Sequence, residues 1–442
     1  MMTPMTREGV QAGSSVGRLT GLTDLIGGYA RRVYPAVLEQ HDRASVASPL
    51  GVWLLLAACA SGARGSELEA LEDALGCPAA EAGSLLAGFL AAPPPALRTA
   101  IALWVAARDA TDAVGEWARG LPEAVESGFM PTQAEADEWA RRSTLGLIRS
   151  FPLQIEETTR VVLASALATR VSWETPFTVV PAAEGLSSSS PWRGAVQQLL
   201  WASDPRGDAM IARTQSAGLV AVHCAVARED VTVISVSGDV GVARSALFDA
   251  LHEVSGALAA GSPELACSLW DLPLGAGHSW EISEQEVDVY VPERRLERIT
   301  GVALPAWSVR AELDLGASAA FGVSPAFQTL RRLVGPRPDD QCHAAQTAVA
   351  TFGRYGFEAA AVTGLAVATA ALRRPSGRAT ERRAVLRFDH PYAALAIAGR
   401  VADVGGGGSR AILTSEDSPF PGLPLFTAWV AEPVEPEEAP PA

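Results

Sequence analysis

Apolar and polar positions along the chain predict helices in the first third and mainly strands in the remainder. Residues 22–40 repeat apolar side chains at a helical spacing, and an almost uncharged run opens at Ser48 and Pro49. We therefore expect an amphipathic helix followed by a buried one. Segments such as 217–239 and 286–293 have the alternation or continuous apolar character of strands. With no internal repeat, the pattern predicts an α+β single domain with a large central mixed sheet and further sheets.

The two ends differ in composition from the folded part. Residues 1–20 are rich in Gly, Ser and Thr, and residues 434–442 are acidic and rich in proline. We predict that both ends are disordered and that they flank a domain at 21–433. No apolar core of signal-peptide length and no bilayer-spanning apolar run is present. We expect no membrane partner and a cytoplasmic location, or secretion if a leader is missing from the sequence.

Composition argues against several classes of function. A net charge of −15 is unfavourable for a nucleic-acid surface. The five cysteines lack a C-x-x-C pair, the six histidines lack metal spacing, and no G-x-S-x-G, H-E-x-x-H or P-loop is present. Asp389 and His390 are adjacent, but neighbours in a strand point to opposite faces, which argues against a catalytic pair. We predict no enzyme, no cofactor and no metal.

The segment 353–372 combines helix-forming alanines with residues that favour an extended chain. Taken alone, its alanine content favours an ordinary helix. Written as a strand, it places Phe357, Ala359, Ala361 and alternate residues after them on one small or apolar face. The other face has Glu358 as its one charge. Such a segment suits the middle of a sheet as well as an exposed loop, which is typical of a two-state element.

This segment resembles the hinge and exposed reactive-centre loop of the serpins, which we place at about 353–384. Family members have a glycine, a small hydroxyl residue, a glutamate and then several small residues here, and Phe357 departs from that pattern. The resemblance implies a hinge made of Gly356, Phe357, Glu358, Ala359, Ala360, Ala361, Val362 and Thr363.

Three further blocks in the same order are similar to serpin segments, so the resemblance extends from about residue 22 to 433. The helix opening at Ser48 and Pro49 is one, and the segment 383–433 looks like the terminal strands. The third block, 160–177, looks like a central strand, with Trp173 matching and Ser165 replacing an asparagine. The resemblance implies a sheet-opening region formed by Ser48, Ser165, Trp173 and Gln346. Gln346 replaces a histidine, so we expect an exchanged polar network around Ser48.

The resemblance implies inhibition of a serine protease by trapping. The protease cleaves the loop and forms an acyl-enzyme, and the freed loop inserts into the central sheet before hydrolysis. Small hinge residues are needed because each slips between packed strands. Bulky Phe357 would slow this step. The alternative is a non-inhibitory serpin-fold protein that binds a partner or ligand. We expect a monomer in either case.

Two cues compete for the cleaved bond. Counting from Gly356 at the family's distance indicates Ala370–Ala371, which suits an elastase-like or subtilisin-like protease. Arg373 and Arg374 would suit a trypsin-like protease instead. The stretch from Arg373 to an expected strand at Val385 exceeds the family norm, which favours the arginines. We predict Ala370–Ala371, because a later cut would lengthen the tether that holds the protease.

Overall fold

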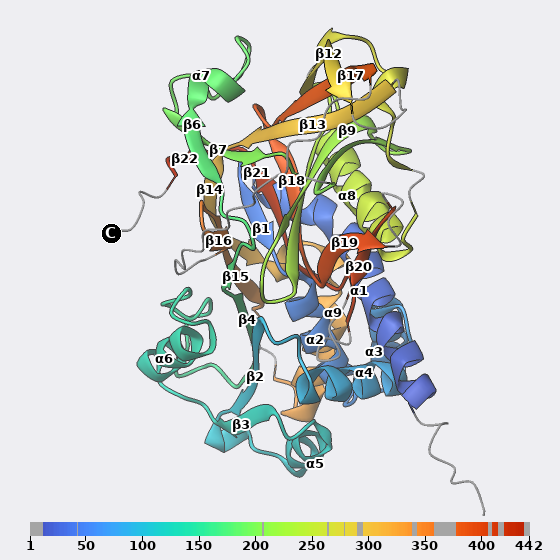
Figure 1. The fold of residues 1–442 in the computed structure, drawn as a ribbon. Helices are drawn as coiled ribbons and strands as arrows, with labels where there is room; N and C mark the ends of the chain where they lie inside the picture. The colour runs from blue at the N-terminus through green and yellow to red at the C-terminus, as the bar shows by residue number, and fades with distance from the viewer. Residues whose placement is uncertain are drawn as a thin grey trace, which may run out of the picture.

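Figure 1 shows a computed structural model in which the helices of the first third of the chain gather around one end of a divided central sheet, while two further sheets, a hairpin and other helices form much of the rest. The structure describes residues 12–41, 43–205, 207–262, 265–277, 279–289, 295–337, 343–357, 377–404, 409–413 and 420–436. This arrangement is the predicted α+β class.

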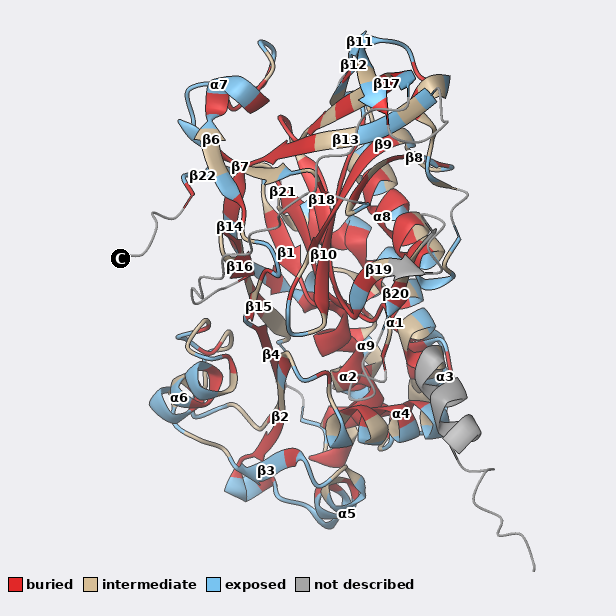
Figure 2. Ribbon diagram, in the orientation of Figure 1, coloured by how far each residue is buried: buried red, intermediate tan, exposed pale blue. Residues whose placement is uncertain are grey.

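The helix that opens at Pro49 is the centre of the helical part. Ser48 precedes it, proline fits its first turn, and eleven of its twelve residues are buried, as Figure 2 shows in red for α2. The described helices are α1 (Ala12–Gln40), α2 (Pro49–Ala60), α3 (Ser66–Leu75), α4 (Ala79–Ala91), α5 (Asp112–Gly120), α6 (Gln133–Ser143), α7 (Ala182–Gly185), α8 (Arg244–Ala259) and α9 (Val323–Leu333).

The central sheet has two parts. In one part, β2 (Leu97–Val105) lies between β3 (Val125–Phe129), parallel to it, and β4 (Val161–Thr169). The other part has the order β22-β14-β15-β16-β5, and β5 directly continues the line of β4 after Arg170. Its strands are β22 (Pro433–Val434), β14 (Ala306–Asp314), β15 (Ala345–Phe352), β16 (Gly356–Phe357) and β5 (Val171–Ser172).

The other two large sheets have six strands each. The second sheet is antiparallel, in the order β1 (Ser45–Ala47), β21 (Pro424–Val430), β18 (Tyr392–Ala398), β10 (Val231–Ser237), β9 (Gly218–Val226) and β8 (Ala209–Thr214). The third has the order β11 (Gly275–Ala276), β12 (Trp280–Val289), β17 (Gly377–Arg387), β13 (Arg295–Leu304), β7 (Gln198–Ser203) and β6 (Thr178–Pro181). A hairpin of β19 (Arg400–Val404) and β20 (Ser409–Leu413) lies beside α8.

Helix α6 covers the outer face of the central sheet. Thr132 and Glu135 form a reciprocal capping box that fixes where the helix begins. Trp139 of α6 packs edge-on against Trp104 of β2, with ring centroids 5.3 Å apart, and Phe151 closes the cluster. The sheet face opposite α6 packs on α2. The divided sheet is therefore enclosed on both sides.

Three predicted boundaries are wrong. Helix α1 begins at Ala12 rather than after residue 20. Val434, assigned to a disordered tail, pairs with Ala306 in β22, because the chain end adds a short edge to β14. The loop does not extend to residue 384, since β17 begins at Gly377 and pairs on both edges.

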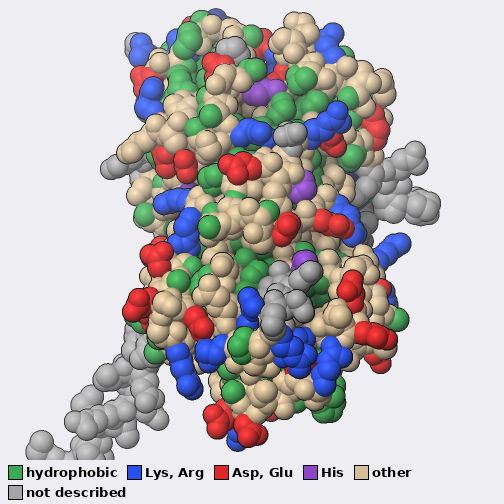
Figure 3. Space-filling model, turned by 180° about the vertical axis from the view of Figure 1, so that it is seen from behind, with side chains coloured by type: hydrophobic (Ala, Val, Ile, Leu, Met, Phe, Trp, Pro, Cys, Tyr) green, Lys and Arg blue, Asp and Glu red, His purple; other side chains and the backbone are tan. Residues whose placement is uncertain are grey.

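No single helix among the described residues is long and apolar enough to cross a membrane. The bent pair α3 and α4 meets the length and composition test only when its two helices are taken together. On the face shown in Figure 3, acidic and basic side chains are intermixed.

Candidate functional site

The divided central sheet contains a slot between β4 and β15. Among the described strands, β4 pairs with β2 and β15 pairs with β14 and β16, but β4 and β15 do not pair with each other. A cavity of about 660 Å³ occupies this region. That volume lies within the range of about 300–1,000 Å³ typical of ligand pockets. Its lining includes Leu163 and Ala164 of β4, Ala345 and Gln346 of β15, Leu56 of α2 and Trp139 of α6.

Strand β16, the start of the predicted hinge, closes the upper end of the slot. Phe357 pairs with Phe352 of β15 on one edge and with Val171 of β5 on the other. Gly353 N donates to Gly356 O (2.9 Å) in the tight turn between β15 and β16. The first two hinge residues therefore already form a central strand in the intact chain.

An aromatic cluster surrounds Phe357, which is only 2% exposed. The Trp307 ring of β14 lies edge-on to it with centroids 6.1 Å apart, and Phe352 stacks on Trp307 at 5.8 Å. Trp173 packs on Phe352 from the other side at 4.9 Å. Phe357 thus already fills an apolar site in the intact chain, and its effect on the rate of insertion stays a prediction.

Trp173 fixes the turn that carries the hinge. Its indole Nε1 donates to Gly353 O (3.0 Å), and its backbone N donates to Tyr355 O (2.9 Å). The neighbouring His223 ring lies 5.7 Å from Phe177 and is buried, which lowers the pKa of His223 to about 4. This ring is therefore neutral near pH 7.

The other three residues of the predicted sheet-opening region lie together at the start of α2. The Gln346 amide donates to Ser48 O and accepts from Ser48 N, both at 2.9 Å. The Ser48 hydroxyl donates to Leu425 O of β21 (2.8 Å). Across the slot, Ser165 Oγ donates to Gly51 O (3.0 Å). The two strands that border the slot are thus tied to one helix, not to each other.

Gly51 allows this close approach. A Cβ at this position would lie 2.8 Å from the Leu167 side chain and 3.2 Å from Ser165 Oγ. A larger residue would therefore require the Leu167 side chain to move and would crowd the Ser165 hydroxyl.

The structure divides the four predicted residues into two groups. Trp173 lies eight residues beyond Ser165 along β4 and β5, which is about 25 Å of extended chain. Trp173 therefore lies apart from Ser48, Ser165 and Gln346, at the far end of the same line of strands. Glu358, Ala359, Ala360, Ala361, Val362, Thr363, Ala370, Ala371, Arg373 and Arg374 lie outside the described residues.

Sequence reasoning missed Trp307 and Phe352, which form the site for Phe357. Phe352 ends an alternating strand immediately before the glycine turn, and that position was a usable signal. Trp307 had no such signal, because its contact with Phe357 joins strands separated by β15.

Asp389 and His390 do meet, contrary to the expectation from strand geometry, because they follow β17 in a bend rather than in a strand. His390 Nδ1 contacts Asp389 Oδ1 (3.0 Å), and Nε2 contacts Gly238 O (2.9 Å) and Ser237 Oγ (3.3 Å). The two shorter contacts join the ring to a neighbouring carboxylate and to a backbone carbonyl of the segment after β10, so the ring links two parts of the interior.

Asp389 is buried, which by itself would raise the pKa of its carboxyl. Hydrogen bonds from His390 and Ser187 outweigh this effect and hold that pKa below its usual value. The group joins the segment before β18 to β10, and we assign it a structural role.

The divided sheet, with β16 paired above its slot, can be set beside known proteins that share part of this chain's sequence or its fold. The family model described as Serpin (serine protease inhibitor) matches residues 26–184. The rice protein serpin-Z6A (Oryza sativa subsp. japonica) is 33% identical over 152 residues, which cover 30% of this chain and 38% of that protein. The chain thus aligns with well under half of that relative's length.

Solved serpin structures match nearly the whole chain. Native tengpin, a thermophilic serpin, has a TM-score of 0.58 at 13% identity, over 97% of this chain and 96% of its own. Human thyroxine-binding globulin in complex with its hormone has a TM-score of 0.60 at 16% identity. The match covers 95% of this chain and 100% of the globulin. Serpin48 of the insect Tenebrio molitor has a TM-score of 0.54 at 15% identity, and the match covers 92% of this chain and 97% of Serpin48. This chain has the serpin fold, and the resemblance expected from its sequence is confirmed.

Replacing Gln346 is expected to destabilise the closed slot. Gln346→Met keeps the length of the side chain but leaves Ser48 N and O without their partner, at a cost of about 2 kcal/mol of unfolding free energy. Denaturant unfolding measures this difference. Gln285→Met, on an exposed position of β12, is the matched control and should change stability little. Equal stability of the two variants would contradict the anchoring role of Gln346.

Proposed function

We propose that this protein inhibits a serine protease by offering residues 358–376 as a substrate and then inserting the cleaved loop into the slot. The observation that carries the proposal is β16, whose two residues already pair between β15 and β5 directly above the slot. A cut further along the loop would free the chain to extend this strand downward. The energy would come from new hydrogen bonds on two edges and from burial of one face.

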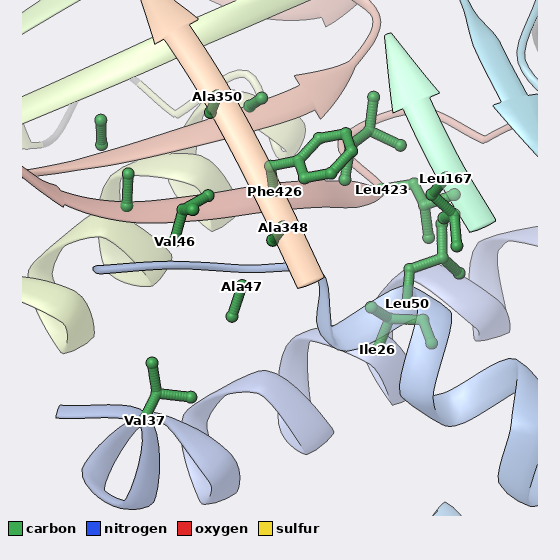
Figure 4. Close-up of a cluster of buried hydrophobic side chains, with 14 of the residues drawn as sticks. Ile26, Val37, Val46, Ala47, Leu50, Leu167, Ala348, Ala350, Leu423 and Phe426 are labelled. Atoms are coloured by element: carbon green, nitrogen blue, oxygen red, sulfur yellow. The ribbon is translucent and has the colours of Figure 1, made fainter. Parts of the chain in front are cut away.

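The register of β16 gives the inserted strand its phase. Continued below Phe357, it places Ala359, Ala361 and Thr363 opposite Ala350, Ala348 and Gln346 of β15. Ala348 and Ala350 are buried, and Figure 4 shows them with Leu167 of β4 and Leu50 of α2 around the same apolar cluster. The small side chains would therefore face the core, which is the phase that the sequence pattern favours.

Glu358 would lie on the opposite face. The register places it between Thr351 and Arg170, of which Thr351 is half-buried and Arg170 is exposed. A charge is tolerated there because it keeps access to water. The one charged hinge residue is thus compatible with insertion.

We propose a serine protease with an elastase-like or subtilisin-like pocket as the partner, and a cut between Ala370 and Ala371. The start of β17 at Gly377 removes one argument for Arg373 and Arg374, because the stretch beyond them is shorter than expected. A monomer and a cytoplasmic location, or secretion with a leader, remain proposals.

The cleaved bond is predicted as Ala370–Ala371. Incubation with elastase-like, subtilisin-like and trypsin-like proteases should give a complex that survives boiling in detergent with one of the first two. Mass spectrometry of the released C-terminal peptide should find Ala371 at its start. A peptide starting at Arg374 or Pro375 would move the bond to the arginines.

Catalytically inactive protease is the control, because it binds without forming an acyl bond and should give no boiling-stable complex. Cleavage without complex by every protease in the panel would count against trapping. It would favour the alternative, a serpin-fold protein that binds a partner or ligand.

A further inference from the structure

The strand that receives the far end of the loop, β17, is held on both edges. It pairs antiparallel with β12 from Trp280 to Val289, in a ladder that extends along the whole of β17. Its other edge pairs with β13 in parallel. Among the strands that the structure describes, β12 thus lies on the outer side of β17, and the short β11 is the one strand beyond it.

Side chains strengthen this ladder at the end of β17 that follows the loop. Glu286 of β12 accepts from Thr380 Oγ1 (2.7 Å), and Glu284 accepts from Arg382 Nε (3.1 Å). Arg382 also donates to Leu269 O (2.8 Å) and lies 4.5 Å from the centroid of the Trp270 ring. Glu281 forms an ion pair with Arg387 at the other end. β12 therefore contacts β17 from end to end.

The position of β17 decides whether an uncut loop can enter the slot. β13 ends at Leu304, next to the start of β14, and its Ala303 pairs with Arg387. The end of β17 therefore lies near the slot, while its start at Gly377 lies about 33 Å further along the strand. Figure 1 shows β13 crossing the top of the molecule, whereas β15 and β4 run down it.

An uncut chain is too short to fill the slot to its lower end while Gly377 stays in place at the start of β17. Continuing the register of β16 to Val161 requires insertion through Val367, about 33 Å below Phe357. The residues from Val367 to Gly377 reach at most about 36 Å when fully extended. That length is enough to return from the bottom of the slot to its top. It leaves no chain to cover the further distance to Gly377 at the start of β17. An uncut loop can fill the slot only if β17 leaves its sheet.

We propose that β12 is a clamp that holds β17 in place and so prevents the intact loop from inserting before a protease cuts it. The proposal rests on the proposed function, because it assumes that the slot accepts the loop. Cleavage separates the loop from β17, so the clamp opposes only the uncut route. It sets the lifetime of the active, loop-exposed form.

The first test weakens the clamp. Glu284→Ala with Glu286→Ala removes the two contacts to the half of β17 that must leave first. Glu312→Ala, an exposed carboxylate on β14 that pairs with Arg310, is the matched control. Uncut protein is held at a raised temperature, and the fraction that resists a denaturant concentration sufficient to unfold fresh protein is measured. Unchanged intact mass shows that no cut occurred.

We expect the uncut double variant to change into the denaturant-resistant, loop-inserted form about three to ten times faster than the parent and the control do. Equal rates would overturn the proposal. So would an absence of conversion in both parent and double variant up to the onset of unfolding, because release of β17 would then not be the limiting step.

The second test locks the clamp. Asp288 and Arg378 are register partners near the loop and both are exposed, so Asp288→Cys with Arg378→Cys can form a disulfide across β12 and β17. The oxidised variant should convert at least about tenfold more slowly than its reduced form. An equal rate in the two redox states would also overturn the proposal.

Protease-cut samples separate this proposal from the proposed function. Cut, oxidised protein should gain the same resistance to unfolding as cut parent, since cleavage frees the loop from β17. If cut parent gains no resistance, loop insertion itself fails. If cut parent gains resistance but neither clamp variant alters the uncut rate, only the clamp fails.

Discussion

Cleavage of the loop between Ala366 and Arg374 should raise the unfolding temperature by about 10 °C or more. After insertion the segment would be a central strand in which about ten residues hydrogen-bond on both edges and bury one face, a gain on the order of 10 kcal/mol. At an unfolding entropy of about 2 cal/mol/K per residue, that gain corresponds to roughly 10 °C for a chain of this length. Calorimetry at a fixed scan rate compares intact and cut protein.

A cut in an ordinary loop gives the opposite result, because it only increases the entropy of the unfolded chain. A protease site introduced after Val240, which is 70% exposed in the loop before α8, is the control. Cutting there should leave the unfolding temperature unchanged or lower it. A cut reactive loop that behaves in the same way would remove the basis of the trapping mechanism.

The sequence was sufficient to predict features that depend on local pattern. Ser48 and Pro49 open a buried helix because proline suits a first turn and the apolar run after it has no charged face. The α+β class and the serpin resemblance followed from blocks of this kind. The role of Gln346 could also be predicted from the sequence, because an amide can donate and accept hydrogen bonds at once. In the structure Gln346 does both, donating to Ser48 O and accepting from Ser48 N.

Features that depend on long-range packing were beyond the sequence. The strand pattern shows the bulk of Phe357 but not the rings of Trp307 and Phe352 that surround it. The expectation that Asp389 and His390 point apart assumed a strand, and a bend changes that geometry. Early pairing of β17 at Gly377 depends on β12 and β13, whose registers no local pattern reveals.

Anchoring both edges of the slot to α2 has a mechanical consequence. Ser165 on β4 and Gln346 on β15 bind successive parts of the same first turn, so the strands can accept a new neighbour without losing these hydrogen bonds. The register places Thr363 of the inserted loop between them. A small hydroxyl at this level would add a hydrogen bond to this polar group, which an apolar side chain could not do.

If the protein traps a protease as proposed, Ala361→Glu should convert it from an inhibitor into a substrate. The register of β16 would place residue 361 between Ala348 and Leu167, both buried on the core side of the slot. A carboxylate there has no partner on either strand, and burying it unpaired costs several kcal/mol. Insertion would stall after acylation, hydrolysis would release active protease, and the stoichiometry of inhibition would rise at least about tenfold. Stability of the uncut protein should change little.

Ala360→Glu is the matched control, one residue away on the face that Glu358 shares. The register places residue 360 between Val349, which is half-buried under α6, and Ala168, which is buried, on the face of the sheet opposite α2. We expect this variant to keep more inhibition than Ala361→Glu, because a glutamate can extend past the half-buried Val349 toward water. Titration against the same protease, with gels to count cut and trapped protein, compares the two. Equal inhibition by both variants would show that the strand phase is wrong, and equal loss would show that any charge in the hinge blocks insertion, whichever face it occupies.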